Sequence, residues 1–423
     1  MHIFLTGSSG FIGRHLLAAF IAKGHSVTCA VRALPEIKRQ GVRYVIADFS
    51  LHIDPQDWLS KLDDIDIVVN AVGIIRQNGN QTFETLHTKA PIALFAASQQ
   101  KGVKLVLQIS ALGADENATS HYHLSKKAAD DYLKNSTLPA IILQPSLVYG
   151  PGGKSASLFN TLASLPVLVK LGHGQQMVQP VHIDDLIETV IRLLSHRPHV
   201  SQTIAVVGPI ALSFTEFIRT LRQAMKLPAP LIATIPLPVA RPLITLFDHV
   251  KHAPLDREMF EMLERGNTAD ASAITALLGR LPRQVSEFFA PAQIATVRRL
   301  ALLNWLLPIL RASLAIVWLV TGVISFGVYP VSDSYELLAR VGVSAGLAPW
   351  MLYGAASLDL AIGVAILCIH RKWIWHLQLM VIIAYSLIIA WKLPEFLVHP
   401  YGPVLKNLPM LAAIWLMSAL EES

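Results

Sequence analysis

The chain has 423 residues, of which 53% are hydrophobic and 15% are charged, and its formal net charge is +6. No motif that interleaves basic and aromatic residues accompanies this charge, so the sequence argues against nucleic-acid binding and favours attraction to a membrane surface. The two cysteines, Cys29 and Cys368, fall in a predicted strand and in a predicted membrane crossing, which excludes a disulfide framework and favours a reducing compartment.

The first element is a short apolar strand over residues 2–5, followed by a turn with three evenly spaced glycines and an apolar-periodic helix over residues 11–23. Gly7 permits a tight turn, Gly10 lets a pyrophosphate approach the backbone, and Gly13 lets the helix pack closely on the strand. The helix N-terminus then faces the phosphates of a dinucleotide. A glycine-rich turn without a ligand is the alternative. The predicted cofactor contacts of this turn are Gly7, Ser9, Gly10, Phe11, Ile12 and Gly13.

The second strand, residues 26–31, ends in Arg32. NAD-dependent enzymes usually carry an acidic residue at this point, whereas a basic residue accommodates the 2′-phosphate of NADP. Arg32 therefore favours NADP(H), with NAD(H) still possible because a solvated arginine would look the same in sequence. Asp48 follows a third strand over residues 43–47 and is predicted to meet the adenine edge.

The fourth strand, residues 65–70, leads into a turn that we expect beside the cofactor. Further on, Tyr122 and Lys126 are four residues apart, so they share one face of a helix. A nearby ammonium favours the phenolate and lowers the pKa of a tyrosine from about 10 toward the range of a proton-transfer group. The predicted cofactor contacts in this part of the chain are Asn70, Ala71, Gly73, Tyr122 and Lys126.

These motifs occur in the order typical of the short-chain dehydrogenase/reductase family. The sequence resembles the atypical branch that includes the nucleotide-binding accessory subunit of respiratory complex I. The resemblance covers about residues 1–290 and implies a Rossmann-type α/β fold with a doubly wound parallel sheet. It rests on residues 6–13, 70–73, 73–76, 109–113, 122–126, 144–152 and 181–185.

The resemblance also implies a catalytic set. Tyr122 would give or take the proton at a carbonyl or alcohol, Lys126 would lower its pKa and hold the nicotinamide ribose, and Ser110 would hydrogen-bond the substrate oxygen. Asn70 is a weaker fourth candidate. Some members of this branch bind the nucleotide without established turnover, and in that case the same residues would only clamp the cofactor.

Residues 151–290 are less regular, and their loops are expected to cover the substrate side. A stretch over residues 237–250 fits an amphipathic helix that lines an apolar pocket, lies on a membrane surface or packs in the core. No metal site is expected, because His121, His123 and His182 lack a third partner with recognisable ligand spacing. Solvated or hydrogen-bonded histidines are the simpler interpretation.

After about residue 300 the chain becomes strongly apolar, in runs that approach the roughly 20 residues a helix needs to cross a bilayer. These runs lack the polar faces of a soluble helical bundle. We therefore predict an all-α, four-helix transmembrane bundle over residues 312–423, preceded by an interfacial linker helix over residues 291–311. The predicted crossings are about residues 312–329, 347–369, 373–391 and 403–420.

The orientation follows from three features. The first strand begins at residue 2, so no signal peptide is expected, and a nucleotide-binding domain belongs in the cytoplasm. Basic residues flanking the crossings show a modest positive-inside bias. We expect a multi-pass protein of a bacterial-type inner (cytoplasmic) membrane with both termini in the cytoplasm. Arg298, Arg299, Arg311, Arg371 and Lys372 fall on the side of the N-terminal domain, and Arg340, Lys392 and Lys406 fall opposite.

The second half resembles the DoxX-like family of four-helix membrane domains over about residues 308–420, a family with a loose link to quinone-related electron transfer. Asp359 lies mid-way along the second crossing, where an ionisable side chain is costly and marks a functional candidate. A structural pin held by Lys406 or a tryptophan N–H is the favoured alternative. Glu395 and His399 would form either a site or a rigid turn. The matching runs are residues 318–322, 352–354, 358–360, 393–396, 399–403 and 406–409.

Together these features predict a membrane-anchored, NADP(H)-dependent oxidoreductase that acts on a lipophilic carbonyl, alcohol or quinone-like substrate. A nucleotide-binding scaffold or assembly factor of a membrane complex, without turnover, is the alternative from another class. A sugar-nucleotide epimerase or dehydratase fits the fold but not the membrane half. The expected partners are the lipid bilayer, a lipophilic small molecule and, in the scaffold case, a membrane complex, but no nucleic acid.

Overall fold

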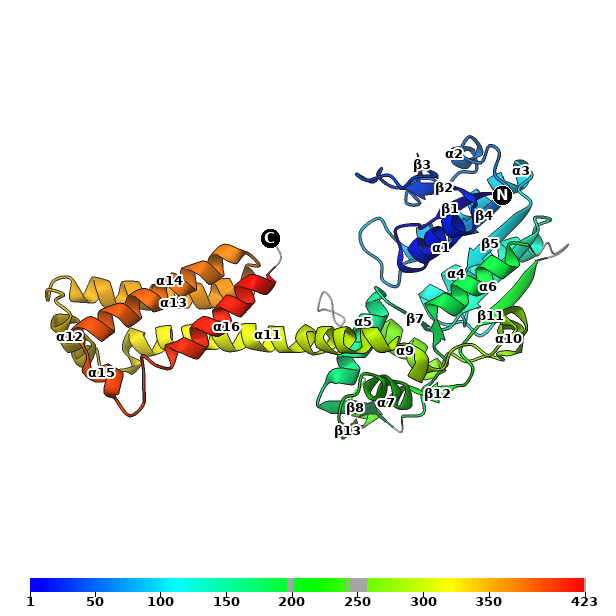
Figure 1. The fold of residues 1–423 in the computed structure, drawn as a ribbon. Helices are drawn as coiled ribbons and strands as arrows, with labels where there is room; N and C mark the ends of the chain where they lie inside the picture. The colour runs from blue at the N-terminus through cyan, green and yellow to red at the C-terminus, as the bar shows by residue number, and fades with distance from the viewer. Residues whose placement is uncertain (173, 196–200, 240–241, 243–256, 422–423) are drawn as a thin grey trace. The chain divides into compact units, whose positions relative to one another are not determined.

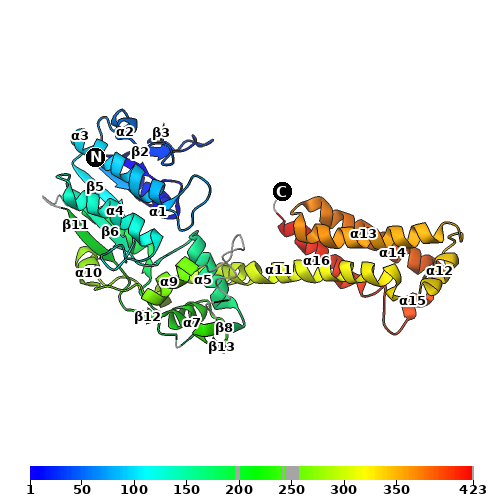
Figure 2. The same ribbon diagram turned by 180° about the vertical axis from the view of Figure 1, so that it is seen from behind.

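The computed structural model describes residues 1–172, 174–195, 201–239, 242 and 257–421, and the chain divides into two compact units, Met1–Ala301 and Leu302–Ser423. Figure 1 and Figure 2 draw the elements of both units from opposite sides. The amphipathic helix predicted over residues 237–250 lies largely outside the described residues.

A seven-stranded parallel sheet forms the centre of the N-terminal unit, with the strand order β11-β6-β5-β4-β1-β2-β3. This sheet confirms the predicted Rossmann-type architecture. The strands are β1 (His2–Thr6), β2 (Ser26–Val31), β3 (Val42–Ile46), β4 (Ile67–Asn70), β5 (Leu105–Ile109), β6 (Ala140–Pro145) and β11 (Gln202–Val206).

Alternate strand residues face two separate cores, because side chains alternate across a strand. Ile3 and Leu5 of β1 point into one core, and Phe4 points into the other. Burial on both faces explains why these strands are apolar throughout their length. Helices α1 (Phe11–Ala22), α6 (Ile183–Leu193) and α10 (Ser272–Leu278) cover the first face, and α2 (Gln56–Leu59), α3 (Ala90–Gln100) and α4 (His121–Asn135) cover the second.

The strand order reverses at the middle of the sheet. The chain builds β1, β2 and β3 in one direction and then returns to build β4, β5 and β6 on the other side of β1. Sheets of this kind bind ligands outside the carboxyl ends of the strands at the reversal. The turns after β1 and after β4 meet there, since a Cβ added to Gly7 would lie 2.6 Å from the carbonyl oxygen of Ala71.

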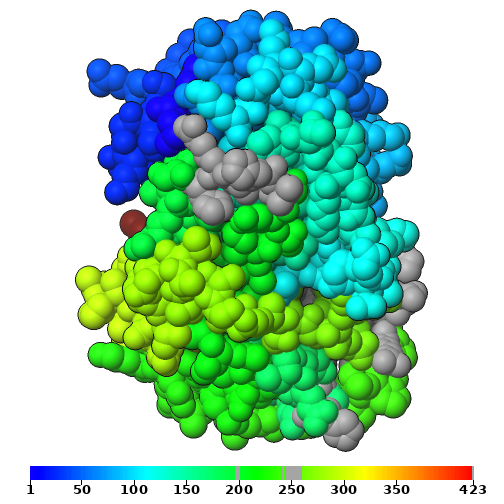
Figure 3. Space-filling view, turned by 90° about the vertical axis from the view of Figure 1, so that its right-hand side faces the viewer, coloured from blue at the N-terminus to red at the C-terminus, as the bar shows by residue number. Residues whose placement is uncertain are grey.

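A smaller group of elements extends the N-terminal unit beyond the sheet. Its helices α5 (Lys154–Ser164) and α7 (Phe214–Ala224) pack through Phe159 and Phe217, whose ring centroids are 5.3 Å apart. In Figure 3, much of this group appears in green below the blue and cyan residues of the sheet. Its short strands form the pairs β7 (Val148–Tyr149) with β10 (Val181–His182), β9 (Met177–Val178) with β12 (Leu212–Ser213), and β8 (Val167–Leu171) with β13 (Leu231–Ile235).

The C-terminal unit is helical. Among the described residues, three helices are long and apolar enough to cross a membrane, namely Pro291–Val328, Ala348–Cys368 and Lys372–Lys392. A fourth, α16, has 14 residues, which is fewer than the roughly 20 of a full crossing. The elements are α11 (Ile294–Val323), the π-helical turn η4 (Ile324–Val328), α12 (Val331–Arg340), α13 (Ala348–Cys368), α14 (Lys372–Lys392), α15 (Glu395–Val398) and α16 (Asn407–Leu420).

The second and third predicted crossings coincide with α13 and α14. The first, residues 312–329, covers the second half of α11 together with η4, and the fourth begins later than predicted, at Asn407. The linker helix predicted over residues 291–311 is not a separate helix. Instead, α11 runs without interruption from Ile294 to Val323, and the boundary between the two units falls inside it. Arg298 and Arg299 change the polarity of the chain there but do not end the helix, because arginine has a high helix propensity.

Candidate active site

The turn between β1 and α1 has the features of a phosphate-binding loop. Gly7 has a φ of 70°, in the left-handed region that favours glycine, and a Cβ added to Gly13 would lie 2.0 Å from the Gly7 carbonyl oxygen. α1 begins after Gly10, and within the described chain no side chain caps its first N–H groups. A Cβ added to Gly10 would fill the space in front of these groups, with Gly7 O at 3.1 Å. The open helix N-terminus and the bare backbone therefore fit a pyrophosphate.

The ends of β2 and β3 bring Arg32 and Asp48 to the same edge, where Ala47 N donates to Val31 O at 2.9 Å. Arg32 is exposed. The Asp48 carboxylate accepts from the hydroxyl and the amide of Ser50, at 2.5 and 2.9 Å. The Ser50 hydroxyl, more than the charge of Arg32, holds the pKa of Asp48 below its usual range. An exposed cation and an ionised carboxylate thus lie beside the predicted position of the adenosine ribose.

The Asn70 side chain is committed to the interior of the sheet and is 0% exposed. Its Oδ1 accepts from Thr6 Oγ1 at 2.6 Å and from Val72 N at 3.3 Å, and its Nδ2 donates to Gln108 Oε1 at 2.7 Å. These bonds tie together the carboxyl ends of β1, β4 and β5. Asn70 therefore shapes the turn after β4 from the interior of the sheet, whereas Ala71 is partly buried and Gly73 is exposed in that turn.

Lys126 and Tyr122 lie on the first turns of α4, as the sequence spacing predicts. Lys126 is 3% exposed, and its Nζ donates to Val72 O at 3.1 Å and to Ile109 O at 3.2 Å. A Cβ added to Gly73 would lie 3.2 Å from this Nζ, so the glycine keeps space beside the ammonium. Burial lowers the pKa of Lys126. The structure thus brings Lys126 together with the turn after β4 and the end of β5.

His87, in the π-helical segment η1 (Glu84–Lys89), completes this cluster although the sequence analysis did not identify it. Its ring meets the ring of Tyr122 edge-on, with centroids 5.4 Å apart at 85°. Its Nε2 accepts from Ile74 N at 3.0 Å, which leaves Nδ1 to donate to Ser125 Oγ, also 3.0 Å away. Burial, and then the charge of Lys126, lower the pKa of His87 to about 2, so it is a neutral positioning group.

Ser110 lies at the end of β5, as predicted, but its hydroxyl points into the interior. It is 4% exposed and donates to Asp130 Oδ2 at 2.5 Å, and Gln144 Nε2 donates to the same oxygen at 3.4 Å. Burial raises the pKa of Asp130, and these two hydrogen bonds act against that increase. Among the described residues, Asp130 Oδ1 has no hydrogen-bond partner. Contact between Ser110 and a substrate oxygen would therefore require its hydroxyl to turn away from Asp130.

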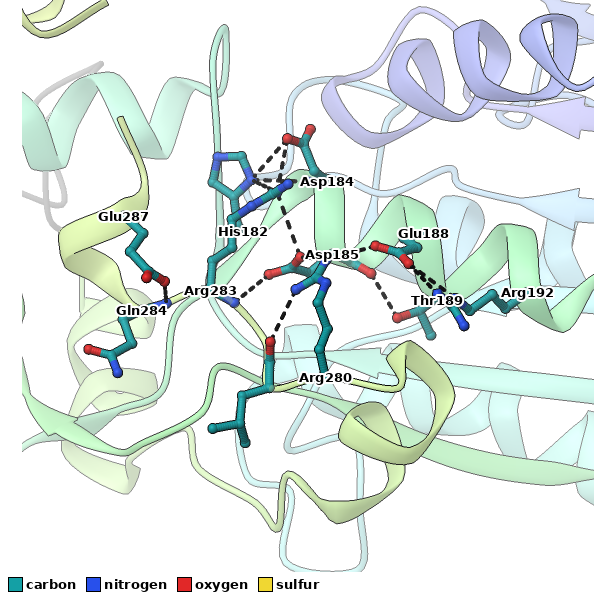
Figure 4. A network of polar contacts seen from close by, with 11 residues as sticks. His182, Asp184, Asp185, Glu188, Thr189, Arg192, Arg280, Arg283, Gln284 and Glu287 are labelled. Atoms are coloured by element: carbon teal, nitrogen blue, oxygen red, sulfur yellow. Dashed lines mark hydrogen bonds and ion pairs between the residues drawn. The ribbon is translucent and has the colours of Figure 1, made fainter. Parts of the chain in front are cut away.

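The run over residues 181–185 has a structural role. Asp185 is 0% exposed and accepts from the backbone N–H of Arg283 and from Nη2 of Arg280, both at 2.7 Å. Arg283 Nη1 lies 2.9 Å from Asp184 Oδ2 and 3.0 Å from His182 Nδ1. Figure 4 shows that these contacts join the start of α6 to the segment after α10. The network fixes the chain that leads on toward α11.

The three histidines considered for metal binding lie in separate environments. His121 is exposed, His182 belongs to the network above, and His123 is buried with Nδ1 3.0 Å from Ser120 Oγ. Burial lowers the pKa of His123 to about 4. The described residues contain no group of three or more His, Cys, Asp or Glu side chains that could hold a metal ion.

Of the residues that the sequence analysis missed, Asp130 carried a usable signal. Tyr122, Lys126 and Asp130 are spaced i, i+4 and i+8, so they form one row along α4. His87 carried none, because its contact with Ser125 joins residues 38 positions apart and depends on how two helices pack.

Two parts of the chain match known protein families. Residues 3–208 match the NAD dependent epimerase/dehydratase family, and residues 315–415 match the DoxX-like family. The N-terminal domain is thus an NAD-binding domain of the epimerase and short-chain dehydrogenase type, and the C-terminal domain is DoxX-like, as predicted. The DoxX-like domain and the three apolar helices together indicate a multi-pass membrane protein.

Two curated relatives extend this result. A ceramide reductase of Caulobacter vibrioides is 28% identical over 187 residues, which is 43% of this chain and 57% of that protein. The mitochondrial NADH dehydrogenase (ubiquinone) 1 alpha subcomplex subunit 9 of Mus musculus is 24% identical over 211 residues, which is 48% of this chain and 55% of that protein. The chain thus spans little more than half the length of these relatives.

Solved structures agree on the fold. UDP-glucuronic acid 4-epimerase from Bacillus cereus, in complex with UDP-glucuronic acid and NAD, has a TM-score of 0.52 at 20% identity and covers 71% of this chain and 100% of its own. A nucleoside-diphosphate-sugar epimerase from Staphylococcus aureus has a TM-score of 0.55 at 18% identity and covers 68% of this chain and 99% of its own. At these identities the likeness concerns the fold alone.

Proposed function

We propose that the protein is a membrane-anchored oxidoreductase that uses NADP(H) to interconvert a carbonyl and an alcohol on a lipophilic substrate. The observation that carries this proposal is the buried Lys126 ammonium, one helical turn after Tyr122 on α4 and hydrogen-bonded at the carboxyl ends of β4 and β5, on a chain with three apolar helices of membrane-spanning length. The name of the Caulobacter relative, ceramide reductase, supports a lipid substrate.

In this reaction the bound cofactor supplies or accepts a hydride at the substrate carbon. The protein itself holds and transfers one proton at the substrate oxygen. In the reducing direction, Tyr122 donates its hydroxyl proton to the developing alkoxide and regains it from solvent. Lys126 stabilises the phenolate left on Tyr122, and Val72 O and Ile109 O hold its ammonium in position. His87 supports the Tyr122 ring edge-on.

The preference for NADP(H) rests on Arg32. Its guanidinium is exposed at the end of β2, where the ribose 2′-phosphate of the cofactor would lie. The Asp48 carboxylate at the same edge is engaged by Ser50 and so leaves the guanidinium available. NAD(H) would bind the same turn without this contact.

For location, we propose a bacterial-type inner (cytoplasmic) membrane with the N-terminal domain and both termini in the cytoplasm. The support is the excess of Arg and Lys at one end of the apolar helices. A lipophilic substrate would then be drawn from the same bilayer that holds α13 and α14.

One specific observation favours a second candidate, a nucleotide-binding scaffold of a membrane complex without turnover. Ser110 directs its hydroxyl into the interior, toward Asp130, and not to the side where substrate would bind. The similarity to a subunit of a mammalian NADH dehydrogenase points to the same class of role. In this candidate, Lys126 and the glycine turn serve only to hold the nucleotide.

The test uses the full-length protein in lipid nanodiscs with NADPH and a panel of long-chain keto-lipids, with product detected by mass spectrometry. Tyr122→Phe should reduce kcat by at least about 100-fold and leave nucleotide affinity within a few-fold, because the hydroxyl acts mainly in the transition state. Lys126→Met should weaken both. Tyr132→Phe is the matched control, since Tyr132 lies on the same helix, outside the site, and packs against the core of the sheet. Tight nucleotide binding with no turnover on any substrate, and no effect of Tyr122→Phe in cells, would favour the scaffold.

A further inference from the structure

The interior of the DoxX-like unit contains two buried polar side chains among its described residues, Gln378 and Asp359. Gln378 on α14 is satisfied at both ends: its Oε1 accepts from Trp318 Nε1 at 3.1 Å and its Nε2 donates to Ile374 O at 3.2 Å. Asp359 on α13 is 5% exposed, and its Oδ1 has no partner in the described part of the chain. Buried polar groups are nearly always hydrogen-bonded, so the second residue requires an explanation.

Among the described residues, neither Lys406 nor a tryptophan N–H, the partners expected for a structural pin, donates to Asp359 Oδ1. The N–H of Trp318, in the interior of the unit, donates to Gln378. At the end of the bundle, the Trp375 N–H is given to Glu421 at 3.0 Å, and Glu421 is also paired with Arg311. These two tryptophan N–H groups therefore donate to other acceptors, and Asp359 Oδ1 has no donor among the described residues.

Asp359 also lies at the depth where a missing partner costs most. It is 11 residues from the start of α13 and 9 from its end, which places it about 16 Å and about 14 Å from the two ends at 1.5 Å per residue. This is the middle of a hydrocarbon core about 30 Å thick. An ionisable side chain at that depth marks a functional site by default.

The two faces beside Asp359 differ in how open they are. Toward α11 the helices touch closely: a Cβ added to Gly322 would lie 3.0 Å from Ala356 O, and one added to Gly363 would lie 2.7 Å from Leu319 Cγ. These contacts lie one turn before and one turn after Asp359, and they leave no space between α11 and α13 there. On α14, Tyr385 lies within range of the charge of Asp359, and its side chain is 37% exposed. A ligand would therefore enter from the α14 side.

We propose that Asp359 is the polar anchor of a binding site inside the DoxX-like unit for a lipid-soluble molecule that carries a hydroxyl or amide hydrogen-bond donor. The orphaned carboxyl oxygen accepts from this donor, and the Tyr385 phenol contributes a second polar contact. The depth of the site selects the ligand class, because a hydrophilic cation or metabolite would lose its hydration there, whereas a long-chain alcohol or amide would not. The site does not depend on turnover in the N-terminal unit.

The test uses the full-length protein in nanodiscs and two photoreactive probes: a long-chain alcohol that carries a diazirine and an alkyne, and its methyl ether, which cannot donate a hydrogen bond. The alcohol should label peptides of α13 and α14, and excess unlabelled alcohol should compete, whereas the ether should label them only without saturation. Asp359→Leu should reduce the saturable labelling about tenfold, the loss expected for one strong hydrogen bond. Asp359→Asn keeps an acceptor oxygen and should retain an intermediate level.

Two variants separate a site from a structural pin. Glu395→Leu also replaces a carboxylate by leucine, but on α15 and opposite Arg340, and should leave labelling unchanged. Asp359→Leu should keep or raise the melting temperature, since no internal hydrogen bond is lost, whereas Gln378→Leu should lower it because the Trp318 N–H loses its acceptor. Equal labelling by alcohol and ether, or an Asp359→Leu variant that is destabilised and labelled like wild type, would overturn the proposal.

Discussion

The buried His87 makes the stability of the N-terminal unit sensitive to acid. Its side chain is 1% exposed, stacks on Phe83 with centroids 5.3 Å apart, and accepts from Ile74 N. Burial and the nearby Lys126 lower the pKa of His87 from 6.5 to about 2. Folded protein therefore keeps this imidazole neutral at any pH above about 2, whereas the unfolded chain protonates it below about 6.5.

The sign and size of the effect follow from proton linkage. Because the pKa is lower in the folded state, the unfolded state binds more protons between the two values, and stability falls as the pH falls through this window. At pH 5, about 1.5 pH units below the pKa of His87 in the unfolded chain, protonation stabilises the unfolded state by about 2 kcal/mol. His123, whose pKa burial lowers to about 4, should add a similar loss over the same range.

The assay is hydrogen exchange of the central amides of β4 and β5, which open only when the whole unit unfolds, in full-length protein at pH 7.5 and pH 5 after correction for intrinsic exchange. In the wild-type protein, the protection factors should be lower at pH 5 than at pH 7.5 by about 30-fold for each buried histidine. His87→Gln keeps an acceptor for Ile74 N but does not titrate, so it should lose about 30-fold less than wild type. His121→Gln, at an exposed histidine of the same site region, should behave as wild type. An unchanged loss in His87→Gln would refute the assignment of a neutral, buried imidazole.

Three further outcomes are expected. Arg32→Glu should weaken NADPH binding by about 10–100-fold and leave NADH binding within a few-fold, measured by titration of cofactor fluorescence; equal losses would argue against a 2′-phosphate contact. Asp185→Asn should lower the free energy of unfolding by about 1–3 kcal/mol in denaturant titrations, more than Glu188→Gln does, because the Asp185 carboxylate is fully buried and holds two donors. A reporter that is active only outside the cytoplasm should be active when fused after Ser344 and silent after Arg371, and the reverse result would invert the proposed orientation.

The features that the sequence determined by itself are those that depend on residues close together in the chain. Three such features are the glycine spacing, the Tyr122–Lys126 interval and the apolar runs. Each is a local pattern that does not depend on how distant segments pack. For this reason the sheet, the glycine-rich turn after β1 and three apolar helices of membrane-spanning length were predictable. The end of the proposed linker helix was not, because the arginines that mark a change in polarity do not interrupt backbone hydrogen bonds in α11.

Only the tertiary structure decided which polar groups meet. Asn70 turns into the sheet because Thr6 and Gln108, 64 and 38 residues away, offer it partners at the ends of neighbouring strands. Ser110 turns to Asp130 for the same reason, whereas Asp359 Oδ1 has no donor among the described residues, and the Trp318 N–H donates to Gln378. A buried polar side chain adopts the orientation in which its hydrogen bonds are completed. The partners are supplied by strand order and helix packing, which no short segment of the sequence specifies.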